Sequence, residues 1–339
     1  MKRRTFISLS ATGMAALSVM SSGLAASTTI QSKVRLGGPV FEKYNSPDEW
    51  IASLKKLGYR AAYCPVSVGA DPELVKAYRQ AAAKNDIVIA EVGAWSNPID
   101  PDKEKAEKAI EKCVASLALA DAIGANCCVN VSGSRNPKNW AGPHKDNLTD
   151  ATFDLIVETT RKIIDAVKPT RTFFTLEAMP WAYPDSADSY LKLIKAIGRE
   201  RFGVHLDPMN LITSPQIYYR NGEMIRDCFR KLGPQIRSCH AKDITLREDN
   251  AVPQLDEILA GKGNLDYPMF LTELAKLKDI PLMMEHLGMA EEYNQAAKYI
   301  RTVGKTVNVE VISRLFNSTK SVDNYTTCIG RGCFRTFRL

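Results

Sequence analysis

Short apolar segments of five to seven residues alternate with longer amphipathic segments from residue 33 to about residue 305. The short segments are rich in β-branched and aromatic residues and show little polar alternation, as is typical of parallel strands that are covered on both faces. The predicted strands are 33–37, 59–64, 87–93, 126–132, 172–178, 202–207, 236–241 and 281–286.

The segments between the strands have helical periodicity with recognisable start and stop signals. The first two helices begin with a capping residue followed by proline, Ser46-Pro47 and Asp71-Pro72, and Gly58 ends the first. The predicted helices are 46–58, 70–86, 102–123, 150–168, 187–199, 222–232, 266–278 and 290–305.

Eight strand–helix units over about 275 residues predict an α/β fold, a single-domain (β/α)8 TIM barrel spanning residues 27–309. A doubly wound open sheet is the alternative, but it usually has a glycine-rich turn after its first strand, and no such GxGxxG motif follows residues 33–37. Two long connections, 132–149 and 242–265, leave the carboxyl ends of strands. Because barrel active sites are built there, we expect lid or substrate-binding segments in both.

Residues 1–26 resemble a bacterial Tat export signal. Arg3 and Arg4 precede an uncharged run of small and apolar residues that ends at a cleavage-compatible site after Ala25 or Ala26. An uncleaved membrane anchor is the alternative, which the glycine and serine content of this run disfavours. We therefore expect a periplasmic or otherwise exported protein whose mature chain has no stable membrane span.

Composition adds little beyond the two ends of the chain. Most of the formal net charge of +7 comes from residues 1–26 and from the basic, irregular segment 310–339, so the body is nearly neutral and no nucleic-acid surface is expected. The segment 310–339 is compatible with a surface extension, an oligomer arm or a disordered end. A homo-oligomer is therefore compatible with the sequence. Of the eight cysteines, most lie in predicted core elements, whereas Cys328 and Cys333 could form a disulfide in an oxidising compartment.

Each of the last four predicted strands has, at or near its end, a side chain that can bind a metal. An isolated carboxylate or imidazole in each place has an ordinary alternative, such as a salt bridge, a turn cap or a core histidine. Four of them on consecutive strands predict a shared site, because the carboxyl ends of parallel strands meet at one end of a barrel. The set favours Mn²⁺, with Mg²⁺, Co²⁺ or Zn²⁺ as alternatives. The four residues are Glu177, Asp207, His240 and Glu285.

The body of the chain, residues 33–305, resembles the xylose isomerase-like TIM barrels, which include sugar isomerases and epimerases, inosose dehydratases and endonuclease IV relatives. The resemblance is carried by TLEAMPW (175–181), VHLDPMN (204–210), SCHAKDI (238–244) and LMMEHLG (282–288). It implies that Glu177 and Glu285 both bind the metal and exchange a proton with the substrate carbon, as in ketose 3-epimerases.

This chain departs from the ketose epimerase pattern near the predicted ligands. Asn210 stands where those enzymes carry a substrate-binding histidine, and His205 is the candidate replacement. Lys242 is a candidate to polarise a carbonyl, with Asp243 to hold it, and Arg247 lies near the place of the family's arginine. Further candidates for substrate contact are Trp95, Trp140, His144, Trp181 and Tyr183. Lys262 is another candidate, although an ordinary structural turn is the favoured interpretation of its segment.

These residues predict a metal-dependent isomerase or epimerase that abstracts a proton next to the carbonyl of a small-molecule carbohydrate. A lyase or dehydratase of the same fold, acting on a keto-sugar or a 3-keto-glycoside, is the alternative because it needs the same enolate. A non-catalytic sugar-binding barrel is less favoured. A nuclease with three zinc ions is disfavoured, because the chain has only four histidines.

Overall fold

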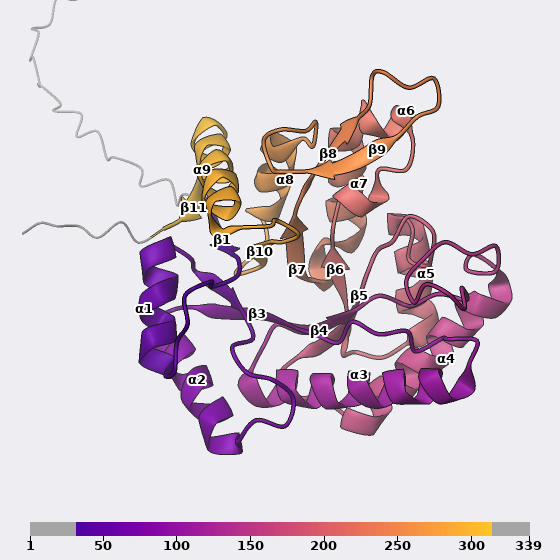
Figure 1. Ribbon diagram of the computed structural model, residues 1–339, viewed down its shortest axis with the longest axis horizontal. Helices are drawn as coiled ribbons and strands as arrows, with labels where there is room; N and C mark the ends of the chain where they lie inside the picture. The colour runs from indigo at the N-terminus through magenta and orange to yellow at the C-terminus, as the bar shows by residue number, and fades with distance from the viewer. Residues whose placement is uncertain (1–31, 314–339) are drawn as a thin grey trace, which may run out of the picture. The chain divides into compact units, whose positions relative to one another are not determined.

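Eight parallel strands close into a barrel in the computed structural model, which describes residues 32–313 (Figure 1). They follow one another around the barrel in chain order, and β10 pairs with β1 to complete the circle. The barrel strands are β1 (Ser32–Gly37), β2 (Ala61–Tyr63), β3 (Val88–Gly93), β4 (Cys127–Asn130), β5 (Phe173–Glu177), β6 (Phe202–Leu206), β7 (Ile236–Ala241) and β10 (Pro281–Met284). This confirms an eight-stranded parallel barrel with helices.

A helix of 8 to 21 residues follows each barrel strand and packs on the outside of the barrel. The predicted starts have a visible cause: Ser46 Oγ accepts a hydrogen bond from the backbone N–H of Glu49, and Gly58 ends the first helix with a left-handed φ of 69°. The helices are α1 (Pro47–Leu57), α2 (Pro72–Lys84), α3 (Lys103–Ile123), α4 (Asp150–Val167), α5 (Ala187–Ile197), α7 (Asn221–Leu232), α8 (Tyr267–Leu274) and α9 (Ala290–Thr306), with a short α6 (Pro215–Tyr218) before α7.

The hydrophobic core lies between the barrel and its helices. Leu36, Leu176, Leu206 and Leu282 are fully buried or nearly so and point outward from the strands into this layer. Side chains of the opposite strand face fill the barrel interior, where a small apolar cluster of Ala61, Ala90 and Met283 gives way to polar residues. The predicted core cysteines are free thiols, and all are buried except the half-buried Cys64.

The long connection after β7 is not a plain loop. It contains an antiparallel hairpin, β8 (Asp243–Leu246) and β9 (Leu255–Ile258), which Figure 1 shows beside the barrel strands. A further strand, β11 (Val309–Ile312), pairs in parallel with the first four residues of β1. The expected boundary of the barrel at residue 309 therefore falls at the first residue of a strand.

Several expectations concern residues outside the described range. These are the export segment 1–26, the part of the C-terminal extension after residue 313, and the pair Cys328 and Cys333. Within residues 32–313, no helix has the length and apolar character needed to cross a membrane.

Candidate metal centre

The four predicted ligands meet at the carboxyl ends of neighbouring strands. Glu177 is the last residue of β5, Asp207 follows β6, His240 lies near the end of β7, and Glu285 follows β10. These strands are adjacent in the order β5, β6, β7, β10. One donor atom from each residue lies within 4.8 Å of the donor atoms of the other three.

The spacing of these donor atoms suits one divalent ion. Nδ1 of His240 lies 2.7 Å from Oε1 of Glu285, 3.3 Å from Oε1 of Glu177 and 3.9 Å from Oδ2 of Asp207. Donor atoms at roughly 2.1 Å from an octahedral ion are separated by about 3 Å when adjacent and about 4 Å when opposite. Three carboxylates and one imidazole form a donor set typical of Mn²⁺ and related ions.

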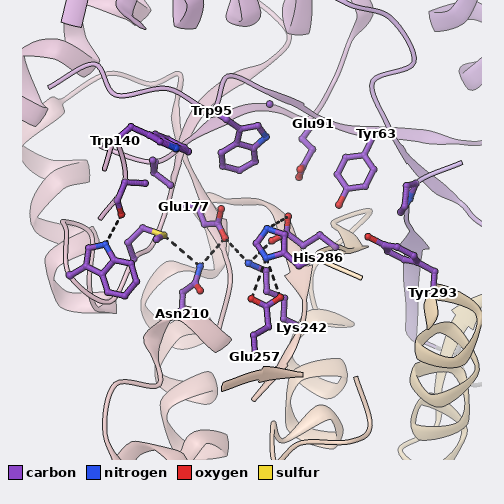
Figure 2. Close-up of a pocket in the computed structure, with 17 residues that line it drawn as sticks. Tyr63, Glu91, Trp95, Trp140, Glu177, Asn210, Lys242, Glu257, His286 and Tyr293 are labelled. Carbon is purple, nitrogen blue, oxygen red and sulfur yellow. Dashed lines mark hydrogen bonds and ion pairs between the residues drawn. The ribbon is translucent and has the colours of Figure 1, made fainter. Parts of the chain in front are cut away.

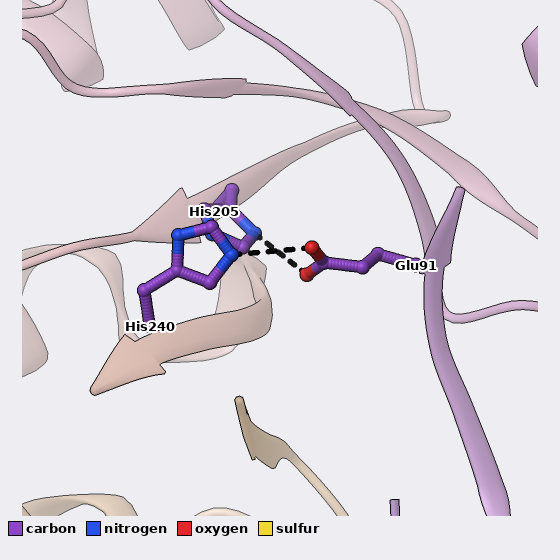
Figure 3. Close-up of side chains that lie close together, drawn as sticks. All are labelled: Glu91, His205 and His240. Atoms are coloured by element: carbon purple, nitrogen blue, oxygen red, sulfur yellow. Dashed lines mark hydrogen bonds and ion pairs between the residues drawn. The ribbon is translucent and has the colours of Figure 1, made fainter. Parts of the chain in front are cut away.

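One further carboxylate, that of Glu91, lies beside the His240 ring (Figure 3). Oε1 of Glu91, on β3, is 3.1 Å from Nε2 of His240, and its Oε2 accepts a hydrogen bond of 3.0 Å from Oγ of Ser238. When Nε2 carries the proton and donates it to Glu91, Nδ1 is left with a free lone pair directed at the other ligands. A carboxylate that orients a ligating histidine in this way is a recurrent part of protein metal sites.

Glu91 was not predicted from the sequence. The signal was present, because Glu91 is the one charged residue in the apolar segment 87–93. It is almost fully buried, and a buried carboxylate requires a partner. Burial alone would raise its pKa, but His240 and His205 outweigh burial and lower it.

Lys242 is the main cation among the carboxylates. Its Nζ lies 2.6 Å from Oε1 of Glu285, 2.9 Å from Oδ2 of Asp207 and 3.6 Å from Oε1 of Glu177. The carboxylates of these three residues raise the pKa of Lys242 despite its burial, so the side chain is charged. Although the ion pairs are short, Oδ2 of Asp207 and Oε1 of Glu285 lack a donor with hydrogen-bond geometry.

The buried cluster carries an excess of negative charge. Its carboxylates are Glu91, Glu177, Asp207 and Glu285, and its cations are Lys242 and a protonated His240. Burial would lower the pKa of His240, but the carboxylates of Glu285, Glu91 and Glu177 raise it well above the ordinary value. A divalent cation would bind Nδ1 of His240 in place of its proton, offset most of the negative charge, and give a partner to the two carboxylate oxygens that lack a hydrogen-bond donor, so the residues fit a metal ion.

The two glutamates differ in their electrostatic environments. Burial raises the pKa of Glu177, and His240 and Lys242 only partly offset this effect. At Glu285 burial acts in the same direction, but His240 and Lys242 outweigh it and hold the pKa well below its usual range. Asn210 adds a neutral contact by donating a hydrogen bond of 2.9 Å to Oε1 of Glu177. The two carboxylates are therefore not equivalent.

A cavity of about 630 Å³ opens above the cluster (Figure 2). Its wall includes five of the predicted substrate-binding residues, and Figure 2 shows Trp140 on the side of Glu177, with His286 and Tyr293 on the other side. The five residues are Trp95, Trp140, Trp181, Asn210 and Lys242.

Other predicted substrate contacts are not brought to the cavity. His205 is fully buried inside the barrel, with its ring centroid 4.0 Å from that of His240. The reason is its position two residues before Asp207, which places it on the same strand face but one layer deeper. Arg247 pairs with Asp256 on the hairpin through a 2.6 Å contact, and His144 accepts a hydrogen bond from the N–H of Asp146 within its own loop.

Of the three remaining candidates, two have structural contacts and one lies outside the cavity wall. The carboxylate of Asp243 accepts backbone hydrogen bonds from Gly261, Gly263 and Leu265, so it closes the connection after β9 instead of holding Lys242. Tyr183 donates a hydrogen bond to the carbonyl of Leu148. The side chain of Lys262 is absent from the cavity wall.

Two further polar residues in the cavity wall were missed. Nδ1 of His286 lies 3.1 Å from Oε1 of Glu257, and its Nε2 is 3.7 Å from Oε2 of Glu285. The hydrogen bond to Glu257 raises the pKa of His286. Glu257 lies on β9, and because the hairpin was not predicted, its approach to the cavity could not be anticipated.

Comparison with known proteins supports the same fold. A family model described as a xylose isomerase-like TIM barrel matches residues 51–311. A search of curated protein sequences finds no match.

Several solved structures share the barrel at low sequence identity. D-psicose 3-epimerase from Clostridium cellulolyticum H10 superposes with a TM-score of 0.59 and 14% identity, covering 81% of this chain and 100% of that one. 3-Keto-D-glucoside 4-epimerase from E. coli gives 0.57 and 12%, covering 80% and 100%. A probable 3-DHS dehydratase from Bacillus anthracis gives 0.57 and 14%, covering 79% and 98%. At these identities the likeness establishes the fold alone.

Proposed function

Because the chain belongs to the xylose isomerase-like TIM barrel family, we propose that it is a divalent-metal-dependent sugar isomerase or epimerase that acts next to a carbonyl group. The observation that carries the proposal is the meeting of Glu177, Asp207, His240 and Glu285 within 4.8 Å beneath a cavity large enough for a sugar. Family members with solved structures include epimerases of free and glycosidic sugars, which supports this substrate class.

We propose Mn²⁺ as the preferred ion, held by the four ligands. A bound divalent ion would supply Lewis-acid polarisation of the carbonyl and so make the neighbouring C–H acidic. Outside the ligand set, Glu91 orients His240 and Asn210 orients the carboxylate of Glu177.

The two glutamates are the proposed proton-transfer groups. Glu177 ends β5 and Glu285 follows β10, with β6 and β7 between these strands, so their carboxylates reach the cavity from different sides. One carboxylate removes a proton from one face of the substrate carbon, and the other returns a proton to the opposite face. The ammonium group of Lys242, which also lines the cavity, stabilises negative charge on a substrate oxygen.

A lyase or dehydratase is the second candidate. It needs the same first proton abstraction, but it also needs a proton donor for the leaving group. His286 lies at the cavity mouth beside Glu285, and its pKa is raised by Glu257, which makes it a suitable donor. The barrel is shared with a probable dehydratase, so this outcome is compatible with the fold. A sugar-binding protein without turnover is a third and less favoured function. Separately, we propose that the protein is exported to the periplasm.

The test is metal analysis of the purified protein, followed by NMR of keto-sugars in D₂O with the Mn²⁺-loaded protein. We expect deuterium to enter at a carbon next to the carbonyl, and Glu177→Gln or Glu285→Gln to reduce exchange by at least about a hundredfold. Glu104→Gln, an exposed glutamate of α3, is the control. An epimer as product supports the first candidate, and an eliminated enone supports the second. No exchange with any keto-sugar or 3-keto-glycoside would contradict both.

A further inference from the structure

The cavity is larger than one sugar ring requires. Its volume is about 630 Å³. Even if each carbon and oxygen atom is given the roughly 30 Å³ that a water molecule occupies in the liquid, a hexose fills little more than half of that space. A single ring held against the metal ligands therefore leaves a second region of the cavity for another part of the substrate.

An aromatic surface lines the side of the cavity next to Glu177. Asn210 contacts Glu177 on one side and Sδ of Met179 on the other, at 2.9 and 3.8 Å, and Met179 begins a turn that carries Trp181. Trp140 lies on the neighbouring loop after β4. Trp140, Met179 and Trp181 are here called the outer platform, and all three line the cavity.

The outer platform is fixed by hydrogen bonds between two loops. Nε1 of Trp181 donates a hydrogen bond of 2.7 Å to the carbonyl of Ala141, the residue after Trp140. Oη of Tyr183 donates one of 3.1 Å to the carbonyl of Leu148 in the same loop. The loops after β4 and β5 are therefore tied together at two places, and the indole of Trp181 is held in position before any ligand binds.

Both indoles of the outer platform remain exposed to solvent. Trp140 is 45% exposed and Trp181 is 36% exposed, among the large apolar side chains of residues 32–313 that remain most accessible. The indole N–H of Trp181 is already used by Ala141, so its free surface is an apolar ring face. Two exposed ring faces at the side of a sugar-sized site, one of them fixed by a hydrogen bond, are suited to stacking against a second ring.

We propose that the outer platform binds the aglycone ring of a glycoside, so that the substrate is a keto-glycoside or keto-disaccharide and not a free monosaccharide. This inference rests on the proposed function, because it places the keto ring over Glu177 and Glu285. The second ring then extends past Asn210 and stacks on Trp140 and Trp181. Trp95 is left for the keto ring, since its indole folds back over Gly93, where a side chain would collide with it.

The test compares 3-keto-β-D-glucosides that differ only in the aglycone: methyl, phenyl or glucosyl. One NMR titration of the Mn²⁺-loaded full-length protein in D₂O gives two readouts. Aglycone signals give Kd, and loss of signal next to the carbonyl gives proton exchange. Because a stacked aromatic contact changes Kd by up to about tenfold, we expect the wild type to prefer a ring aglycone over methyl by roughly ten- to a hundredfold.

The double variant Trp140→Ala/Trp181→Ala should reduce this preference to about twofold. Tyr219→Ala removes an exposed aromatic ring outside the cavity wall and is the matched control, which should retain the preference. If the double variant fails to fold by circular dichroism, Trp140→Ala alone should still lower the preference several-fold.

The outcomes separate the two proposals. Equal affinities of the wild type for methyl, phenyl and glucosyl probes would overturn the outer platform as a ring site, as would an unchanged preference in the double variant. A ring preference without proton exchange would keep the platform and contradict the proposed function. Preference for phenyl alone would show an aryl glycoside, and preference for glucosyl would show a disaccharide.

Discussion

Nε2 of His240 lies 3.1 Å from Oε1 of Glu91, while Nδ1 of the same ring lies 2.7 Å from Oε1 of Glu285. One imidazole thus connects a carboxylate inside the barrel to the carboxylates beneath the cavity. The first contact joins strands β3 and β7, across the barrel interior, and both side chains are buried. This arrangement makes Glu91 responsible for the tautomer of the neutral His240 ring, although Glu91 is not one of the four proposed ligands.

The substitution Glu91→Gln should weaken metal binding by about 10–100-fold, because the amide no longer supplies a negative partner for the N–H of His240. Isothermal titration of the metal-free protein with Mn²⁺ measures this effect directly. Glu257→Gln also removes one carboxylate from the cavity wall but leaves His240 untouched, so it is the matched control. An unchanged Mn²⁺ affinity in Glu91→Gln would show that the contact has no orienting role.

Lys242 should matter most when no metal is bound. Its ammonium is the main partner of Asp207 and Glu285 in the buried cluster, and removing one member of a buried ion pair typically costs about 3–5 kcal/mol. We therefore expect Lys242→Met to lower the free energy of unfolding by several kcal/mol in chelator, and saturating Mn²⁺ to restore most of it. Denaturant unfolding with and without the ion tests both parts.

Lys276→Met is the control for Lys242→Met. Lys276 also pairs with a carboxylate, that of Glu273 at 2.6 Å, but its side chain is 60% exposed. Exposed pairs contribute about 0–1 kcal/mol, so this variant should unfold nearly like the wild type in either condition. A loss in Lys242→Met that Mn²⁺ does not reverse would mean that the lysine supports the fold independently of the site.

The parts of the molecule that follow from local sequence were predictable. The apolar strands, the capped helices and the polar strand ends at Glu177 and Glu285 each have a signal within a few residues, and parallel closure then fixes which ends meet. The hairpin β8–β9 lacked such a signal, because each strand has only four residues and half of them are polar. Glu257 was missed with it.

Residues that face the barrel interior were harder to place. Strand alternation predicts which side of the sheet a side chain faces, but not how far it lies from the cavity. His205 and Asp207 point to the same side of β6, yet only Asp207 reaches the level of the ligands. The same problem hid Glu91, whose partner His240 is 149 positions away in the chain. Arg247 was placed by analogy with a family position, and the hairpin carries it to Asp256 instead.

Two glycines have a left-handed backbone conformation, but only one of them is crowded by a neighbouring side chain. Replacing each with alanine therefore separates the cost of the backbone conformation from the cost of a steric clash. Gly133 has a φ of +100°, and a Cβ there would collide with Oδ1 of Asn97, which accepts a hydrogen bond of 2.9 Å from the N–H of Ser134. Gly69 has a φ of +86° and nothing near its absent Cβ. Gly69→Ala should cost about 1–2 kcal/mol and Gly133→Ala clearly more, as measured by denaturant unfolding. Equal costs would show that the Asn97 contact adjusts without penalty.

His205 should make stability depend on pH in a defined direction. Burial, followed by the neighbouring charge of His240, lowers the pKa of His205 to about 4 from an ordinary 6.5, and neither ring nitrogen has a hydrogen-bond partner among residues 32–313. Between these two pH values the unfolded chain binds a proton at this position that the folded protein does not. Stability contributed by the neutral ring is therefore present above pH 6.5 and is lost as pH falls toward 4.

Because the imidazole makes no hydrogen bond, His205→Leu should fold normally at pH 7.5 and should remove one proton from the linkage. The slope of unfolding free energy against pH between 6.5 and 4 should then be smaller than in the wild type by about 1.4 kcal/mol per pH unit, since each proton contributes that amount. Urea unfolding of both proteins in chelator, across this pH range, measures the difference directly and cancels the carboxylate contributions common to both. Parallel slopes would mean that the buried ring takes up a proton as readily as a solvated one. That result would contradict the lowered pKa of His205.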